Sequence, residues 1–171
     1  MSTTFRELLT RIDGPTLLEK LDLGPSEVLD DLCALACDLT GMDAAAVAMV
    51  HDKDIVVIGQ HKMPAANFRR SIYNSVQYKN FIETNEPLKV FPNAPLFNGE
   101  IARFTYTARA RVMVEGEMIG GFFLYHNRPQ ALGDRDLQLT LTDFAGIAAE
   151  VVLSKASLKL MLKDVFSLAS R

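Results

Sequence analysis

The sequence predicts an α+β fold in which a central antiparallel sheet carries N- and C-terminal helices on one face, with further helices and loops over a possible pocket on the other. Three observations lead to this prediction. Apolar residues recur with helical spacing near both ends of the chain, and two pairs of strand-like apolar runs each enclose a short polar turn. With 171 residues, the chain is also long enough to bury most of its apolar surface in one core.

Helical spacing dominates the N-terminal part of the chain. The apolar residues of Thr3–Ile12 share one helical face, and a weaker helical pattern covers Thr16–Leu21. Ser26 can cap the N-terminus of a stronger helix that ends near Gly41.

Extended periodicity follows this helix. Ala44–His51 and Ile55–His61 flank a charged turn and are expected to form an antiparallel hairpin. The more polar region Met63–Asn85 fits two helical pieces, the second of which contains Phe81. Leu88–Phe91 then predicts a short strand that enters a proline-rich loop.

A second hairpin is expected from about Phe104, and its stretch ARVMVEGEMIGGFFLYH (Ala110–His126) should form the centre of the sheet. Gly120 and Gly121 follow the turn of this hairpin and allow neighbouring backbone to approach closely. The chain closes with one long amphipathic helical pattern over Asp134–Ala169.

Three stretches carry a family resemblance. In LTGMDAAAVAMVHDKD an apolar helix runs through Gly41 into a strand, and EPLKVFPNAPLF reads as a strand followed by a loop. In EGEMIGGFFLYHNRPQALGDRDLQLTLTDFAGIAAEVV a glycine-containing turn precedes a strand, and an acidic residue precedes the last helix. Together they resemble a GAF domain, a small-molecule sensing module of many signalling proteins that is related in architecture to PAS domains. The resemblance covers residues 25–153 and implies helical extensions at residues 1–24 and 154–171.

The resemblance implies little catalytic chemistry for this chain. GAF-type free methionine sulfoxide reductases need a nucleophilic and a resolving thiol in loops, but no cysteine follows Cys37. A covalently attached bilin also needs a pocket cysteine and is not expected either. The pattern of cyclic-nucleotide-binding members is not matched, because YKNFIETNE (Tyr78–Glu86) has the wrong spacing.

The cysteines and histidines do not form a metal-binding pattern. Cys33 and Cys37 lie one helical turn apart on an apolar face, and we expect buried thiols there. His51, His61 and His126 lie at strand ends without a second ligand at motif spacing, so we expect them to be solvated or hydrogen-bonded. Neither a metal nor a cofactor is therefore expected.

Two arginines and a set of aromatic residues are the candidate ligand-binding residues. Arg109 and Arg111 share one face of their strand, which looks either toward a cavity, where they could hold a carboxylate or phosphate, or toward solvent. The aromatic side chains either line a pocket or fill the core. The candidates are Phe81, Phe91, Tyr106, Arg109, Arg111, Met113, Phe123 and Tyr125.

The charge distribution and the hydropathy of the chain indicate which classes of partner to expect. The net charge of -3 is spread along the chain without a basic stripe, so nucleic acid is not expected as a partner. No apolar stretch approaches the ~20 residues that span a bilayer, so we expect a cytoplasmic protein that does not enter a membrane.

The end of the last helix, SKASLKLMLKDVFSLAS, is too apolar to stand alone in water. It should either pack in a homodimer of the terminal helices or fold back on Thr3–Ile12.

These observations favour a non-catalytic sensory or regulatory domain that binds an unidentified small molecule and passes the change through dimeric helix packing to a protein partner. Two alternatives remain open. One is a ligand-free interaction module of the same fold. The other is an enzyme with an unrecognised site, although no nucleophile, base and orienting group occur together in the sequence.

Overall fold

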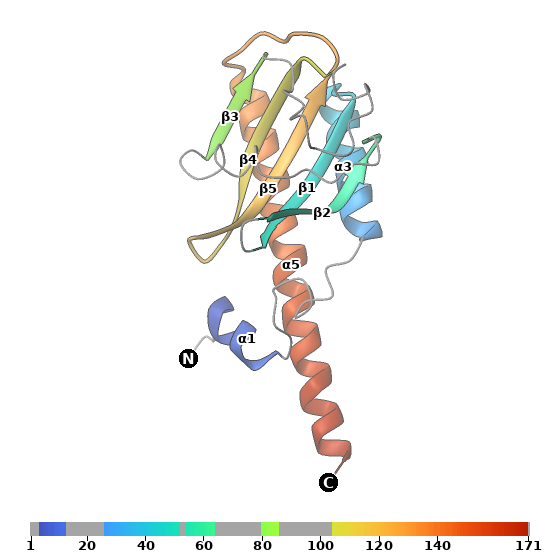
Figure 1. The fold of residues 1–171 in the computed structure, drawn as a ribbon, viewed down its shortest axis with the longest axis vertical. Coiled ribbons are helices and arrows are strands. Elements are labelled where there is room, and N and C mark those ends of the chain that lie inside the picture. The colour runs from blue at the N-terminus through green and yellow to red at the C-terminus, as the bar shows by residue number, and fades with distance from the viewer. Residues whose placement is uncertain (1–3, 13–25, 52–53, 64–79, 86–103, 171) are drawn as a thin grey trace.

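The computed structural model describes residues 4–12, 26–51, 54–63, 80–85 and 104–170, which form a five-stranded antiparallel sheet with helices on one face (Figure 1). The elements are α1 (Phe5–Arg11), α3 (Glu27–Thr40), β1 (Ala44–His51), β2 (Asp54–His61), β3 (Phe81–Thr84), β4 (Tyr106–Val114), β5 (Glu117–His126) and α5 (Arg135–Ala169). The strand order is β2-β1-β5-β4-β3, so the second hairpin holds the centre of the sheet, as expected.

Helix α3 begins and ends where its capping residues require. The Ser26 Oγ accepts a hydrogen bond from the Leu29 N–H at 3.5 Å, which satisfies one of the free donors of the first turn. At the other end Gly41 adopts a left-handed φ of 71°, and its N–H donates to the Cys37 carbonyl at 2.8 Å. Both helix ends lie where the sequence predicts them.

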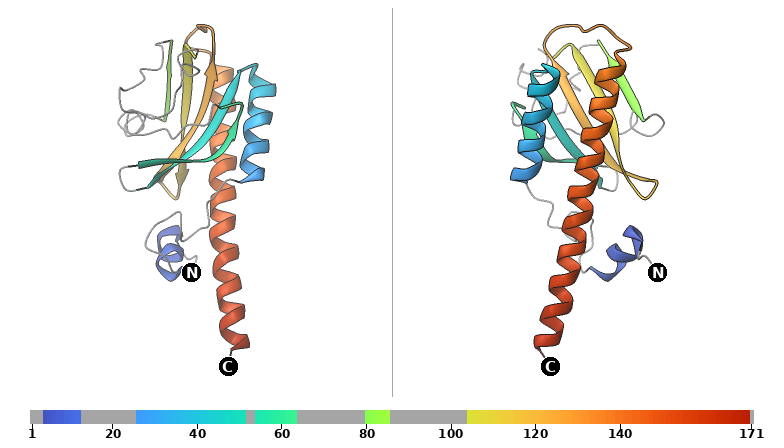
Figure 2. Two further views of the ribbon diagram at one scale, coloured as in Figure 1. Left: turned by 45° about the vertical axis from the view of Figure 1, so that its right-hand side comes forward. Right: turned by 180° about the vertical axis from the view of Figure 1, so that it is seen from behind.

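Helix α5 is a single element of 35 residues, as its periodicity predicts. The Asp134 Oδ1 caps its first turn by accepting from the N–H groups of Asp136 and Leu137 at 2.9 and 3.3 Å. Its first half crosses β4, and its second half extends well beyond the sheet (Figures 1 and 2). Among the described helices, none is long and apolar enough to cross a membrane.

The main core lies between the sheet and the layer formed by α3 and α5, which lie side by side (Figure 2). Alternate strand residues point into this core because successive side chains of a strand point to opposite faces. The fully buried members include Leu29, Val47, Ile58, Val112, Phe122, Leu124 and Leu141. The predicted arrangement of N- and C-terminal helices on one sheet face is therefore confirmed.

The turn and the glycines of the β4–β5 hairpin explain its tight geometry. Glu115 and Gly116 have positive φ values of 50° and 81°, as a type I′ turn requires. A Cβ built at Gly120 would lie 2.0 Å from the Ala48 carbonyl oxygen, so β1 and β5 approach too closely there for any side chain. The predicted close backbone approach is confirmed at this glycine.

Helix α1 lies outside the sheet, beside the second half of α5 (Figure 2). Phe5 in this helix and Ile12 directly after it are buried and belong to the main apolar cluster. Arg11 forms an ion pair with Asp164 at 3.3 Å, and the Lys163 Nζ donates to the Arg11 carbonyl at 2.9 Å. The N-terminal helix therefore folds back on the terminal helix, which is one of the two arrangements that the sequence leaves open.

One secondary-structure prediction is wrong. Phe81 was expected in a helical piece, whereas residues Phe81–Thr84 form strand β3 and pair with β4 from Phe81↔Ala110 to Thr84↔Thr107. The open edge of β4 offers a complete ladder of backbone hydrogen bonds, and this outweighs the weak helical pattern of a four-residue segment. The expected helix at 16–21, the first helical piece of Met63–Asn85 and the expected strand at Leu88–Phe91 lie outside the described residues.

Candidate functional site

The sheet has a second face, turned away from α3 and α5, on which the two arginines lie. Ala108, Ala110 and Val112 of β4 point into the main core, so the alternating residues of the same strand point the opposite way. We call this surface the arginine face. It is formed by Thr107, Arg109, Arg111 and Met113 of β4 and by Gly121, Phe123 and Tyr125 of β5.

Arg109 is the most unusual residue of the arginine face because only 3% of its surface is exposed. Burial, assisted by the nearby charge of Arg111, lowers the pKa of the Arg109 guanidinium to about 10. This pKa still keeps the side chain positively charged near neutral pH. Its stem passes close to Gly121, where a built Cβ would lie 3.4 Å from the Arg109 Cδ. Arg109 is therefore not an ordinary solvent-facing arginine.

Arg111 lies two residues further along β4 and is partly exposed. Its N–H donates to the Asn80 carbonyl at 2.9 Å, and its Nη1 donates to the Asn80 Oδ1 at 3.4 Å. Asn80 directly precedes β3, so the edge strand positions this guanidinium.

Aromatic rings follow the arginines along the neighbouring strand. The rings of Phe123 and Tyr125 are stacked with centroids 6.3 Å apart, and Phe104 lies 5.4 Å from Tyr125. Both β5 rings are buried, and burial raises the pKa of the Tyr125 hydroxyl, which therefore stays protonated. In register, Arg109 pairs with Phe123 and Thr107 pairs with Tyr125. A polar row on β4 thus runs beside an aromatic row on β5.

The structure brings five of the eight candidate residues together and places two others, Tyr106 and Phe81, on the opposite face of the sheet. Arg109, Arg111, Met113, Phe123 and Tyr125 share the arginine face. Tyr106 lies on the opposite face, where its hydroxyl donates to the Glu83 Oε2 at 2.6 Å, and Phe81 packs against the main core. Tyr106 is three positions from Arg109, and an odd spacing in a strand reverses the face. Phe91 lies outside the described residues.

Thr107 and Gly121 of the arginine face, and Phe104, which contacts Tyr125, are absent from the sequence-based candidates. Strand alternation from Arg109 marks Thr107. No comparable sequence pattern marks Phe104 or Gly121, because their roles depend on the pairing of β4 with β5 and on the ring contact with Tyr125.

No family model matches the sequence, and no curated protein is similar enough in sequence to count as a relative. Solved structures, in contrast, are clearly similar. The GAF domain/HD domain protein from Geobacter sulfurreducens superposes with a TM-score of 0.61 at 16% identity, over 83% of this chain and 98% of that one. The GAF domain from Acinetobacter phosphoenolpyruvate-protein phosphotransferase gives a TM-score of 0.60 at 12% identity, over 92% and 98% of the two chains. The chain has the GAF fold.

GAF folds also occur in enzymes. The type II free methionine-R-sulfoxide reductase from Thermoplasma acidophilum has a TM-score of 0.57 to this chain at 12% identity, over 73% of this chain and 89% of the other. In the present GAF fold Cys33 and Cys37 are buried and not disulfide-bonded. Burial raises the pKa of Cys37 to about 11 and raises that of Cys33 further. Both are therefore neutral, shielded thiols inside the helical layer, as the sequence predicts, and poor nucleophiles.

The described part of this GAF fold holds no group of three or more metal-ligating side chains. His126 instead belongs to a loop contact. Its Nδ1 accepts from the Arg128 N–H at 3.0 Å and lies 3.1 Å from the Gln130 Nε2. His61 is partly buried at the end of β2, and the side chain of His51 is outside the description.

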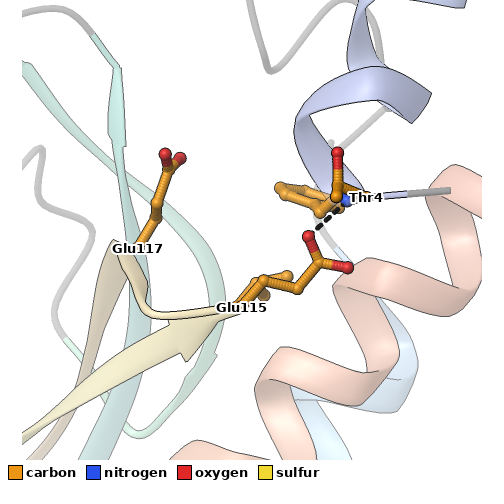
Figure 3. A pocket seen from close by; sticks show the side chains of 5 residues that line it. Thr4, Glu115 and Glu117 are labelled. Atoms are coloured by element: carbon orange, nitrogen blue, oxygen red, sulfur yellow. Dashed lines mark hydrogen bonds between the residues drawn. The ribbon is translucent and has the colours of Figure 1, made fainter. Parts of the chain in front are cut away.

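A small open pocket of about 210 Å³ lies between α1 and the β4–β5 turn (Figure 3). Its lining is Thr4, Phe5, Val114, Glu115 and Glu117. The Glu115 Oε2 accepts from the Phe5 N–H at 2.5 Å, whereas Glu117 points away from this bond. Thr4 and Glu7 also form a capping box, with bonds of 3.2 and 2.8 Å. These groups secure the start of α1 and do not form a catalytic arrangement.

Proposed function

We propose that this chain is a non-catalytic, GAF-type sensory or regulatory domain that binds a small molecule on the arginine face and signals through the packing of its terminal helices in a homodimer. The observation that carries the proposal is the burial of Arg109 on the sheet face that α3 and α5 leave open. Small-molecule sites combine a few charged or polar groups with aromatic walls, as Arg109 and Arg111 are combined here with Phe123 and Tyr125.

Strand β4 connects the arginine face with the helical layer, because its side chains alternate between the two faces of the sheet. Arg109 and Arg111 point to one side of it, whereas Ala108, Ala110 and Val112 contact the core beneath α5. A ligand that shifts β4 by a fraction of an ångström therefore acts directly on the helix that it supports. It changes the helix packing only to the extent that it binds one packing better than the other.

From Ile147 onward, α5 carries a largely apolar stripe that suits a second copy of the chain. Its positions alternate in steps of four and three residues, as in a coiled coil. We call the set Ile147, Val151, Ser154, Leu158, Met161, Val165 and Leu168 the α5 stripe. Leu158 and Met161 are 56% and 63% exposed in the single chain.

Charge complementarity favours a parallel pairing of two α5 stripes. Glu150 and Lys155 flank the stripe five residues apart, and in a parallel coiled coil these two positions on opposite helices face one another. Each of two symmetry-related contacts would then join Glu150 of one chain with Lys155 of its partner. This pairing supports the homodimer part of the proposal.

Native mass spectrometry of the protein as purified, beside its denatured mass, tests the proposal. The expected result is a dimer with an added small-molecule mass that is lost on denaturation. A dimer that carries no added mass, and that no compound stabilises, contradicts the sensor and supports a ligand-free interaction module. That alternative draws on the burial of Phe123 and Tyr125, which can also be explained as core filling.

A further inference from the structure

We infer that the ligand of the arginine face is an anion with a flat apolar body, whose carboxylate or phosphate group binds Arg109 and Arg111. This inference rests on the proposed function and specifies the chemical class of its ligand. Three features of the arginine face support it: the spacing of its polar row, the interaction between its charges, and the aromatic row beside it.

The polar row consists of Thr107, Arg109 and Arg111, whose hydrogen-bond donors all lie on the same face of the sheet. Thr107, Arg109 and Arg111 are alternate residues of β4, so neighbouring members are about 7 Å apart along the strand and lie on the same face. Long guanidinium side chains at this spacing can converge on one acid group, and each can bind two oxygens at once. The Thr107 Oγ1 and the Arg111 Nε are buried and have no hydrogen-bond partner among the described residues. They are therefore available to a ligand oxygen or donor.

The charges of the row also favour an anion. Arg111 is among the causes that lower the pKa of Arg109, so the two positive charges interact across a buried surface. An acid group bound between the guanidiniums interacts favourably with both charges and reduces their mutual repulsion. A neutral ligand of the same shape leaves this repulsion unchanged, and a cationic ligand increases it.

The aromatic row predicts the rest of the ligand. Phe123 and Tyr125 pair in register with Arg109 and Thr107, so an acid group on the β4 side brings the ligand body over the β5 rings. Gly121, opposite Arg111, has no side chain, and a Cβ there would lie 2.9 Å from the Phe123 ring. The ring therefore lies low against the sheet beside the arginines. Phe123 and Tyr125 are both buried, so a group held against them is shielded from water, which favours a flat apolar body over an extended polar chain.

Thermal unfolding with small probe anions tests the inference. The probes are benzoate and phenyl phosphate, each compared with chloride at the same ionic strength and with benzamide, the neutral isostere of benzoate. We expect benzoate, phenyl phosphate or both to raise the melting temperature, and benzamide to leave it unchanged. Stabilisation by benzoate alone assigns a carboxylate ligand, and stabilisation by phenyl phosphate alone assigns a phosphate ligand.

Substitutions of Arg111 test whether the stabilisation by the probe anions arises from binding at the arginine face. Arg111→Met keeps an apolar stem of similar length and should weaken binding of the stabilising probe by about tenfold or more, because it removes a charge-assisted hydrogen bond. Arg111→Lys keeps the positive charge but loses the planar guanidinium that can bind two oxygens at once. This variant should bind the stabilising probe with intermediate affinity. Arg128→Met changes an exposed loop arginine and should bind like the unmodified protein. Equal stabilisation of Arg111→Met and the unmodified protein overturns the inference.

The inference and the proposed function fail in distinguishable ways. If the mass retained in native mass spectrometry belongs to a neutral or cationic molecule, or if benzamide stabilises as well as benzoate, the anion inference is wrong while the sensor proposal stands. If neither probe anion stabilises the protein, the inference is also wrong. If in addition no mass is retained and no neutral or cationic compound stabilises the protein, the proposed function fails with it.

Discussion

Gly120 and Gly146 have opposite structural roles at the scale of single residues. A Cβ at Gly120 would meet the backbone oxygen of Ala48, whereas a Cβ at Gly146 in α5 would have nothing within 4 Å. Gly120→Ala should therefore destabilise the protein by about 1–3 kcal/mol or more, because backbone rather than a mobile side chain must move. Gly146→Ala should stabilise it by about 0.5–1 kcal/mol, because alanine favours the helix. Urea unfolding of both variants checks the pair, and a neutral Gly120→Ala would contradict the close approach of β1 and β5.

The two thiols give a prediction that depends on pH. Because burial raises the pKa of Cys37 to about 11, only about one thiol in a thousand is ionised at pH 8 in the folded state. Neither Cys37 nor Cys33 should react appreciably with a disulfide reagent at pH 8 in native buffer, and both should react within minutes in denaturant. The native rate should rise with pH up to about 11. A fast stoichiometric reaction at pH 8 would show that the helical layer opens readily.

Strand β3 shows, at the scale of elements, how one side chain connects an edge strand to a helix. The Glu83 carboxylate accepts from the Tyr106 hydroxyl and from the Gly133 N–H, both at 2.6 Å, directly before the cap of α5. Glu83→Ala should cost about 1–3 kcal/mol because it leaves the buried Tyr106 hydroxyl unpaired, whereas the exposed Gly133 N–H can bond to water instead. Asp31→Ala, at an exposed position of α3, should cost less than about 0.5 kcal/mol. Calorimetry measures both changes, and equal effects would contradict this role of Glu83.

Helix α5 allows a sharp test of which of its faces is buried. Leu141 is 0% exposed and Leu139 is 59% exposed, although they lie only two residues apart. Leu141→Asp should unfold the domain, because it places an unpaired charge in the main core at a cost of about 4 kcal/mol or more. Leu139→Asp should fold normally. Circular dichroism distinguishes the two outcomes, and a folded Leu141→Asp would show that the assigned helix face is wrong.

The sequence predicts long elements better than short ones for a physical reason. In α3 and α5 the helical pattern repeats over many turns and the caps Ser26 and Asp134 mark the starts, so local information suffices. Strand β3 has only four residues, and its structure is decided by the open edge of β4, which lies far away in the sequence. Such an edge cannot be recognised in one dimension.

The sequence likewise predicts only part of the candidate site. Alternation along β4 correctly groups Arg109, Arg111 and Met113, and it also places Tyr106 on the other face, although Tyr106 was grouped with them for its aromatic character. The face that the helices leave open is a tertiary property. It follows from the packing of α5 on β4 and could not be decided from the sequence.

At the scale of the whole molecule, the α5 stripe predicts the oligomeric state. The double variant Leu158→Asp/Val165→Asp places charges at two core positions of the proposed coiled coil and should convert the dimer to a monomer without loss of helix content. Ser167→Asp adds a charge to the same helix outside the stripe and should remain dimeric. Size-exclusion chromatography with light scattering measures the mass. A dimeric double variant, or a monomeric unmodified protein, would contradict this interface.

The two buried tyrosines have a consequence for spectroscopy. The chain has four tyrosines and no tryptophan, so its near-ultraviolet signal comes largely from this small set of phenol rings. Tyr106 reports on the helix-covered face through its bond to Glu83, and Tyr125 reports on the arginine face through its stacking with Phe123. Each face therefore contains its own chromophore. Phenylalanine substitutions at the two positions would separate their contributions, so that events on the two sides of the sheet could be followed without an attached label.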